Sequence, residues 1–328
     1  MKKILQHLLE HKTLTQEEAY QLMLGIGKGD YTNAELAALT TIYLMHNITI
    51  PELIGFKQAL YDMCNQIQFD GISYTDIVGT GGDNKNTFNI STTSALVVAG
   101  AGYKVVKHGN YAVSSTSGSS NVLENLGYTF TNDKALLTAQ LQEANCTFLH
   151  APLFHPALAK VATVRKELGI RTIFNLLGPL VNPACPQYQV LGVYNLEVAR
   201  LYEYVLQQGT TTYSIVHTYD GYDEATLTSD TKIIKNNGSL ICTPEQLGKR
   251  TVQQADLYSG NSVGQAATIL TNVLTHQATW AQQAVVLANA AIAISNMNTL
   301  ITYQDAYNQA VESLESGRAY QCLQSLIQ

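Results

Sequence analysis

The chain has 328 residues, of which 46% are hydrophobic and only 13% are charged, and its formal net charge is −6. The apolar share is typical of globular proteins and excludes a disordered chain, and the length suits one large domain or two ordinary ones. No run of Lys and Arg exceeds two residues, so we expect no general affinity for DNA or RNA.

The first 70 residues are predicted to form helices. Two capping boxes, Thr15-Gln-Glu-Glu18 and Thr32-Asn-Ala-Glu35, each place a hydroxyl and a carboxylate where they satisfy free N–H groups at a helix start. Apolar residues recur at helical spacing behind both boxes. Pro51 suits the first turn of a third helix, which we expect to run to about Gln66.

From about residue 74 onward, short apolar runs alternate with helical periods. The runs predict strands at residues 76–78, 104–107, 146–149, 188–193 and 213–218. The helical periods predict helices at residues 91–101, 117–126 and 196–208. Such alternation favours a mostly parallel sheet with helices on its faces.

Two further segments complete the predicted architecture. Residues 155–180 look helical and interrupt the alternation, so we expect them to pack with the N-terminal helices, and residues 262–327 are helical again. The predicted fold class is α/β, with a small all-helical domain and a larger α/β domain built on a mostly parallel central sheet. We expect the helical domain to comprise residues 1–70 joined by about 154–182, and the α/β domain to comprise 71–153 and 183–328.

The cysteines and the apolar segments bear on the compartment. The five cysteines are scattered without a CxxC pair, so they predict free thiols in a reducing compartment rather than a zinc or redox site. The N-terminal sequence mixes Gln, His and Glu into its apolar run, unlike a signal peptide. The most apolar window, residues 284–294, is shorter than the roughly 20 residues that span a bilayer. We therefore expect a cytoplasmic protein without a membrane partner.

A glycine-rich loop follows the first predicted strand. Gly79, Gly81 and Gly82 stand directly before Asp83, so the backbone can turn its N–H groups toward an anion. The helix predicted from Ser91 adds the positive end of its dipole. The pattern is neither GxGxxG nor a P-loop. It is compatible both with a phosphate or diphosphate site and with a tight strand-to-helix turn.

Hydroxyl and amide side chains surround this loop in the sequence. Asn89, Ser91 and Thr92 open the following helix, where capping alone could explain them. Lys107 ends the next predicted strand, and a hydroxyl-rich run over residues 114–120 follows it. Lys107 could supply a positive charge to a phosphate or could lie on the surface. So many small donors between a strand and a helix favour a binding loop.

A pair of adjacent carboxylates, Asp223 and Glu224, lies just past the strand predicted at 213–218. Ligands of open α/β sheets bind at such strand ends. Magnesium is typically held by one or two carboxylates, and substrate phosphates complete its shell. The pair and the glycine loop therefore predict a magnesium–diphosphate site.

Arginines and histidines supply the remaining candidates. Arg165 and Arg171 fit either an amphipathic helix surface or a clamp for a carboxylate. The histidines, His108 and His155 among them, have no metal-ligand spacing, and GxSxG is absent, so neither a zinc site nor a serine hydrolase is expected.

Six ordered motifs together resemble the anthranilate phosphoribosyltransferase family, whose fold is similar to that of the nucleoside phosphorylases. They are Asp76-Ile-Val-Gly-Thr-Gly-Gly-Asp83, Thr87-Phe-Asn-Ile-Ser-Thr92, Lys107-His-Gly-Asn110, Ser117-Gly-Ser119, Phe174-Asn-Leu-Leu-Gly-Pro-Leu-Val-Asn-Pro183 and Asp220-Gly-Tyr-Asp-Glu224. The resemblance implies transfer of a phosphoribosyl group from phosphoribosyl pyrophosphate to anthranilate in tryptophan biosynthesis. It also implies a homodimer and magnesium, with two ions per active site.

The resemblance also implies roles for individual residues. Phosphoribosyl pyrophosphate would be bound by Gly79, Gly81, Gly82, Asp83, Thr87, Asn89, Ser91, Thr92, Lys107 and Ser119. Anthranilate would meet Asn110 and Arg165, with Gly79, His108, His155 and Gly178 nearby. The metal would be held by Ser91, Asp223 and Glu224. An aromatic amine needs little activation as a nucleophile, so we assign no general base.

Two positions depart from the family pattern, and two alternatives stay open. Tyr111 stands where Arg is more frequent and Asn121 stands where Asp is common, which puts substrate affinity in doubt but not the reaction class. A pyrimidine nucleoside phosphorylase is similar in fold and loops, but it would not need the pair Asp223 and Glu224. A catalytically silent relative that binds nucleic acid is disfavoured by the acidic composition.

Overall fold

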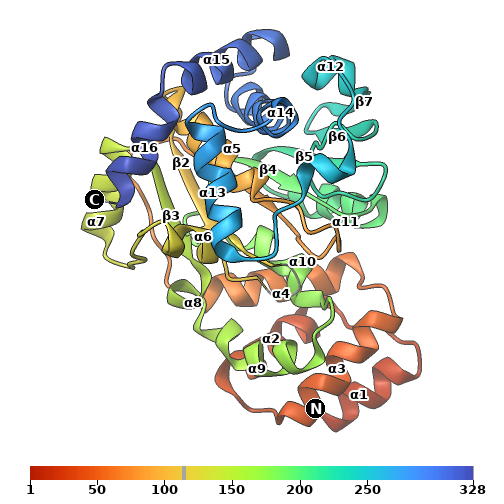
Figure 1. Cartoon of the computed structure of the whole chain (residues 1–328). Helices are drawn as coiled ribbons and strands as arrows, with labels where there is room; N and C mark the ends of the chain where they lie inside the picture. The colour runs from red at the N-terminus through yellow and green to blue at the C-terminus, as the bar shows by residue number, and fades with distance from the viewer. Residues whose placement is uncertain (113–115, 328) are drawn as a thin grey trace.

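The computed structural model describes residues 1–112 and 116–327. Ser114 and Ser115, which belong to the predicted hydroxyl-rich run, lie outside the described residues. The N-terminal helices form one end of the molecule, and the central sheet and the C-terminal helices form the other (Figure 1). This arrangement agrees with the change of sequence period near residue 74.

The N-terminal end consists of four helices, which are α1 (Lys2–Leu9), α2 (Gln16–Lys28), α3 (Asn33–Met45) and α4 (Ile50–Asp62). Both predicted capping boxes are present, because Thr15 and Thr32 accept hydrogen bonds from the backbone three residues later. The helix α4 ends four residues before the predicted Gln66. The residues after Asp62 do not continue the helix, because the N–H of Asn65 donates to the carbonyl of Phe154 at 2.8 Å.

Seven strands form one sheet in the order β3-β2-β1-β4-β5-β6-β7. Their bounds are β1 (Thr75–Gly79), β2 (Val105–Gly109), β3 (Cys146–His150), β4 (Tyr188–Gly192), β5 (Thr212–Thr218), β6 (Thr231–Lys235) and β7 (Gly238–Cys242). The strands β1 to β5 are parallel, as predicted. The chain order reverses between β1 and β4, and in open sheets of this kind ligands bind beside that reversal, at the carboxyl ends of the strands. The glycine loop leaves β1 there.

The antiparallel hairpin β6–β7 was not predicted. Asn236 and Asn237 connect its strands, and Gly238 starts the second one. Asn followed by Gly is a strong hairpin signal when it lies between apolar runs. Helix α7 (Lys134–Glu143) was not predicted either.

Helices cover both faces of the sheet. The remaining ones in that half are α5 (Ile90–Gly100), α6 (Ser119–Asn125), α11 (Leu196–Leu206), α12 (Pro244–Gly248), α13 (Val263–Leu274), α14 (Trp280–Met297), α15 (Tyr303–Glu315) and α16 (Arg318–Ile327), with a 3-10 helix at Gln254–Leu257. Neighbouring strand residues point to opposite faces of the sheet. Val190 of β4 packs in the hydrophobic core that contains α5 and α14, and Leu191 packs in the core that contains α11 and the N-terminal helices. This alternation is expected for a sheet that is covered on both sides.

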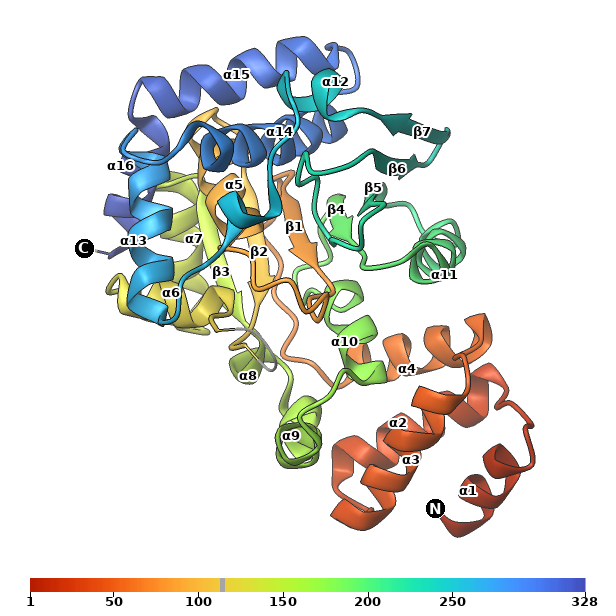
Figure 2. The same ribbon diagram turned by 45° about the vertical axis from the view of Figure 1, so that its right-hand side comes forward.

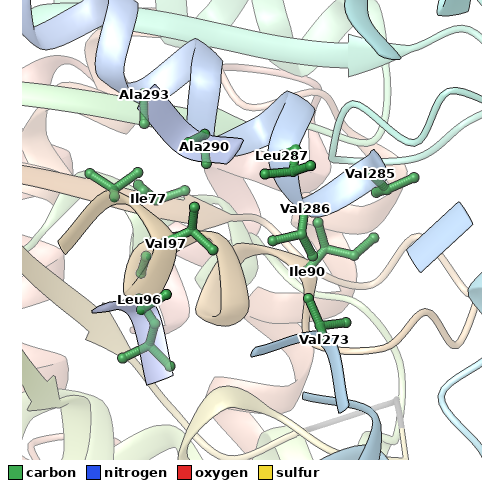
Figure 3. Close-up of a cluster of buried hydrophobic side chains, with 14 of the residues drawn as sticks. Ile77, Ile90, Leu96, Val97, Val273, Val285, Val286, Leu287, Ala290 and Ala293 are labelled. Carbon is green, nitrogen blue, oxygen red and sulfur yellow. The ribbon is translucent and has the colours of Figure 1, made fainter. Parts of the chain in front are cut away.

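The core on one face is built around α14. Val286, Leu287 and Ala290 of α14 lie over Ile90 and Val97 of α5 (Figure 3). Helix α14 is buried along most of its length, as expected for a helix that is apolar on all sides. Within the part of the chain that the structure describes, no helix is long and apolar enough to cross a membrane.

The segment between β3 and β4 joins the two ends of the molecule. It contains α8 (Ala151–Phe154), α9 (Pro156–Leu168), α10 (Ile173–Leu177) and a 3-10 helix at Gly178–Leu180, so it is helical as predicted. Helix α9 packs against α2 and α3, and α10 packs against α3 and α4. Figure 2 shows α10 between the sheet and α4. The carboxyl ends of β1 and β2 consequently face this segment across a cleft.

Candidate active site

The cleft at this junction is lined from both sides. The sheet contributes the loops after β1, β2 and β5, and the helical segment contributes α9, α10 and the turn that follows α10. The residues to which the family resemblance gave a role in binding substrate or metal line this cleft, except His155, and the other candidate arginine, Arg171, lies outside the lining. Lining residues that the sequence analysis did not single out include Asn86, Leu158, Phe174 and Asn175.

The glycine loop is shaped by two left-handed residues and one close approach. Gly81 and Gly82 have φ angles of 62° and 71°, which residues with side chains rarely adopt. A Cβ at Gly79 would overlap Oδ2 of Asp223. The N–H of Gly81 donates to that same oxygen at 2.7 Å. The N–H of Gly81 therefore points toward negative charge, as in an anion-binding nest.

Two carboxylates, the buried Asp223 and the half-buried Glu224, accept hydrogen bonds from backbone N–H groups of the site. Glu224 accepts a hydrogen bond of 3.0 Å from the N–H of Ser91, in the first turn of α5. Burial and the neighbouring Asp83 raise the pKa of Asp223 to about 6, and burial together with Asp223 and Asp83 raises the pKa of Glu224. These carboxylates are thus crowded and poorly solvated, which is a setting that favours binding a cation.

The donor set fits magnesium bound together with a phosphate ligand. Oδ2 of Asp83 is buried without a hydrogen-bond partner, close enough to Asp223 to affect its pKa. Among the described residues, no group of three or more His, Cys, Asp or Glu could hold a metal alone. Magnesium usually takes only one or two carboxylates and completes its shell with water and substrate phosphates.

Lys107 lies beneath the loop and is buried rather than on the surface. Its Nζ donates to the carbonyl of Ile77 and lies 3.4 Å from Oγ of Ser91. Burial raises the pKa of Asp76 to about 6, and the charge of Lys107 opposes this shift. Asn182 donates to Asp76 at 2.9 Å. Sequence reasoning gave no role to Asp76 or Asn182, although both lie within the quoted motifs.

Asn89 and the serines after β2 are oriented toward each other. Asn89 is the N-cap of α5, but its side chain makes no capping bond. Instead, its Oδ1 accepts a hydrogen bond of 3.2 Å from Ser117. Ser119 donates to the carbonyl of Asn110 at 3.4 Å. Capping alone therefore does not explain Asn89, and its bond to Ser117 joins the loops after β1 and β2 at the edge of the cleft.

Arg165 provides the positive charge on the helical side of the cleft. Its guanidinium carbon lies 5.9 Å from the centre of the Phe174 ring, and its Nε is buried without a hydrogen-bond partner. Burial lowers the pKa of this guanidinium. A half-buried guanidinium with a free Nε, next to an aromatic face, suits the carboxylate and ring of an aromatic acid.

His108 and His155 form a buried pair with ring centres 5.1 Å apart. His108 lines the cleft and its Nε2 has no partner. His155 lies behind it and contacts the carbonyl of Val181 through Nε2 at 2.8 Å. Burial lowers the pKa of His155 to about 4, and burial and then His155 lower the pKa of His108. Both imidazoles are therefore neutral at physiological pH.

The two departures from the family pattern both support the loop after β2. The hydroxyl of Tyr111 donates to Glu124 at 2.6 Å, and its ring meets His150 edge-on at 4.7 Å between ring centres. Oδ1 of Asn121 accepts hydrogen bonds from the N–H groups of Ala112 and Gly118, at 2.9 and 3.0 Å. Neutral side chains thus stand at both positions, and that of Asn121 binds the N–H groups of Ala112 and Gly118.

Comparison with known proteins agrees with this geometry. The family described as "Glycosyl transferase family, helical bundle domain" matches residues 2–64, and "Glycosyl transferase family, a/b domain" matches residues 72–320. An anthranilate phosphoribosyltransferase from Cytophaga hutchinsonii is 53% identical over 327 residues, covering 100% of both chains. One from Bacteroides thetaiotaomicron is 47% identical over 328 residues, covering 100% of this chain and 99% of the relative.

Solved structures show the same likeness. The crystal structure of the Thermus thermophilus anthranilate phosphoribosyltransferase superposes with a TM-score of 0.90 at 31% identity, covering 98% of each chain. The Saccharomyces cerevisiae enzyme in complex with PRPP and Mg gives a TM-score of 0.90 at 26% identity, covering 98% of this chain and 95% of the yeast chain. The chain therefore belongs to the anthranilate phosphoribosyltransferase family, the pentosyl-transferring glycosyltransferases of tryptophan biosynthesis.

Proposed function

We propose that the cleft binds phosphoribosyl pyrophosphate against the glycine loop and anthranilate beside Arg165, and joins them. The observation that carries this proposal is that an anion-binding nest with two carboxylates opens into the same cleft as a half-buried guanidinium whose Nε has no hydrogen-bond partner. In the reaction the bond between C1 of the ribose and the pyrophosphate oxygen breaks, and the oxygen keeps the electron pair. The anthranilate nitrogen forms the new bond to C1 and releases a proton to solvent.

At the donor end, the chain would bind the negative charge of the pyrophosphate group and hold phosphoribosyl pyrophosphate in position. The N–H groups of the glycine loop and of the first turn of α5 would hold the pyrophosphate, and Lys107 lies behind them. Such fixed dipoles act on charge as it develops, without having to reorganise. The residues proposed for this substrate are Gly79, Gly81, Gly82, Asp83, Thr87, Asn89, Ser91, Thr92, Lys107 and Ser119.

Asp223 and Glu224, with the hydroxyl of Ser91, would hold magnesium in this site, and we propose two ions. The support is the convergence of these groups and the presence of Mg in the yeast relative's complex. When bound, magnesium supplies positive charge that favours departure of pyrophosphate.

At the acceptor end, Arg165 and Asn110 would orient anthranilate. The guanidinium would pair with the carboxylate, and the amine would then point across the cleft to C1. Gly79, His108 and Gly178 would shape the space for the ring, and His155 would support His108 from behind. Correct orientation of two reactants can supply about 7–11 kcal/mol of the barrier reduction.

We also propose a division of the chain and an assembly. Residues 1–70 with about 154–182 would form the helical domain, supported by the packing of α9 and α10 on α2 to α4. Residues 71–153 and 183–328 would form the α/β domain.

The helical end exposes Leu9, Leu44, Met45 and Ile170 to solvent, which supports a homodimer through this end. A measurement of the protein's mass in solution by light scattering tests the homodimer.

The free cysteines support a reducing compartment, which we propose to be the cytoplasm.

The decisive experiment follows the fluorescence of anthranilate in the presence of the purified protein and phosphoribosyl pyrophosphate, with and without magnesium. We expect the anthranilate signal to fall only when magnesium and both substrates are present. A folded protein that leaves anthranilate unchanged under saturating conditions would contradict the proposal.

A further inference from the structure

Arg171 lies outside the cleft lining, yet it touches the donor loop. It belongs to the short connection between α9 and α10, and its Nη2 donates to the carbonyl of Gly82. The guanidinium lies over the Tyr194 ring, 3.6 Å from the ring centre. Tyr194 follows β4, the strand next to β1. Arg171 therefore bridges the helical segment, the glycine loop and the neighbouring strand end.

The contact with Gly82 is close. A Cβ at Gly82 would lie 3.0 Å from Nε of Arg171, so the side chain packs directly on the left-handed backbone of the loop. Other bonds that hold the loop include those from the N–H groups of Thr80 to Gly192, at 2.9 Å, Gly81 to Asp223, at 2.7 Å, and Lys85 to Asp83, at 3.1 Å. Of these, Arg171 is the anchor that comes from the helical side of the cleft.

The same connection carries the acceptor clamp. Arg165 is in the last turn of α9, and Gly169 ends that helix in a left-handed conformation. The chain then turns so that Arg165 faces Phe174 in the cleft while Arg171 faces Gly82. One short segment thus contacts the proposed anthranilate site with one arginine and the proposed pyrophosphate loop with the other.

We propose that Arg171 is a positioning residue that fixes the glycine loop in its binding conformation by holding the Gly82 carbonyl. This inference rests on the proposed function, since it assumes that the loop binds phosphoribosyl pyrophosphate. A guanidinium can do this better than an ammonium, because its planar fork stacks on Tyr194 while it donates to Gly82. Its charge also opposes the effect of burial on the pKa of Asp83 and Asp223.

The test measures binding of phosphoribosyl pyrophosphate with magnesium by calorimetry, without anthranilate, and then the KM of each substrate. We expect Arg171→Ala to weaken donor binding about tenfold, equivalent to about 1.4 kcal/mol. The KM for anthranilate should stay within about twofold, and Arg171→Lys should recover part of the donor affinity. The matched control is Arg250→Ala, which removes an arginine stacked on Trp280 at 3.8 Å, outside the cleft lining. It should bind the donor like the wild type.

Further results separate the outcomes. Tyr194→Leu removes the ring under the guanidinium and should weaken donor binding in the same direction, even if Arg171→Ala fails to fold. Equal donor affinity of the wild type and folded Arg171→Ala would overturn the inference, and so would an equal rise in both KM values. A wild-type protein that does not bind the donor at all would instead contradict the proposed function.

Discussion

The close approach of Gly79 to Asp223 allows one substitution to test the acidic site without removing any of its groups. In Gly79→Ala, the new methyl would overlap Oδ2 of Asp223 and lie 3.0 Å from its Cγ. Ordinary carbon contacts are about 3.5–4.0 Å, so the carboxylate must move by about 0.5–1 Å. The shift stretches or breaks its 2.7 Å hydrogen bond to Gly81 and moves the proposed magnesium ligand.

The size of the effect follows from that hydrogen bond. A hydrogen bond to a charged group contributes about 1.5–3 kcal/mol, and about 1.4 kcal/mol corresponds to a tenfold change. We therefore expect kcat/KM for phosphoribosyl pyrophosphate to fall about tenfold to about a hundredfold, with a higher magnesium requirement. The readout is anthranilate fluorescence across a magnesium titration.

A control separates crowding at Asp223 from a general cost of replacing glycine. The nearest atom to a Cβ at Gly209 would be the carbonyl oxygen of Leu206 at 3.7 Å, an ordinary contact on the surface. Gly209→Ala should therefore keep the wild-type magnesium dependence. If Gly79→Ala also keeps it, the carboxylate of Asp223 is not the group that controls metal and donor binding, and the reasoning fails.

Three further predictions concern the acceptor, the pH dependence and the helical end. Arg165→Ala should raise the KM for anthranilate about tenfold or more and leave the KM for phosphoribosyl pyrophosphate little changed, since the lost charge-assisted pairing is worth about 1.5–3 kcal/mol. An unchanged anthranilate KM in steady-state assays would exclude the proposed clamp. The pKa of Asp76 is raised to about 6, so its contribution to stability is fully present below about pH 4 and is lost as the pH rises through 6. The unfolding free energy of the wild type relative to Asp76→Asn should fall over that interval in urea titrations, and a constant difference would refute the assignment. Gly55→Ala should destabilise the fold by about 1–3 kcal/mol, because its Cβ would overlap the carbonyl of Gln16 and lie 2.9 Å from the Cβ of Ala19 in α2. A melting temperature equal to that of the wild type would show that α2 and α4 can separate at little cost.

The parts of this molecule that the sequence predicts well are those governed by local chemistry. The capping boxes at Thr15 and Thr32 start helices because their hydrogen bonds span only three residues. The strands β1 to β5 follow from apolar runs that are each buried on both faces. The loop at Gly81 and Gly82 and the pair Asp223 and Glu224 could be identified because each combines a distinctive composition with a position after a strand.

The rest depends on contacts between distant segments. The end of α4 is set by the bond from Asn65 to Phe154, which no local pattern near residue 62 contains. The sequence leaves Arg171 open between a surface charge on a helix and a clamp for a carboxylate, and its contact with Gly82 exists only because the segment between β3 and β4 folds back over the sheet. Likewise, Asp76 is separated by 106 positions from Asn182, its hydrogen-bond partner.

The placement of α14 bears on how the protein is made. This helix covers Ile77 and Val97, but it is encoded about 200 residues after them. On the ribosome, the surfaces of α5, β4 and β5 that pack on α14 must wait for residues 280–297 before they can be covered. Helices α2, α3 and α9 find their partners within the first 168 residues. A nascent chain that stops after β7 would therefore carry a packed helical end and an exposed apolar surface over α5, β4 and β5, and that surface is where chaperones would be required.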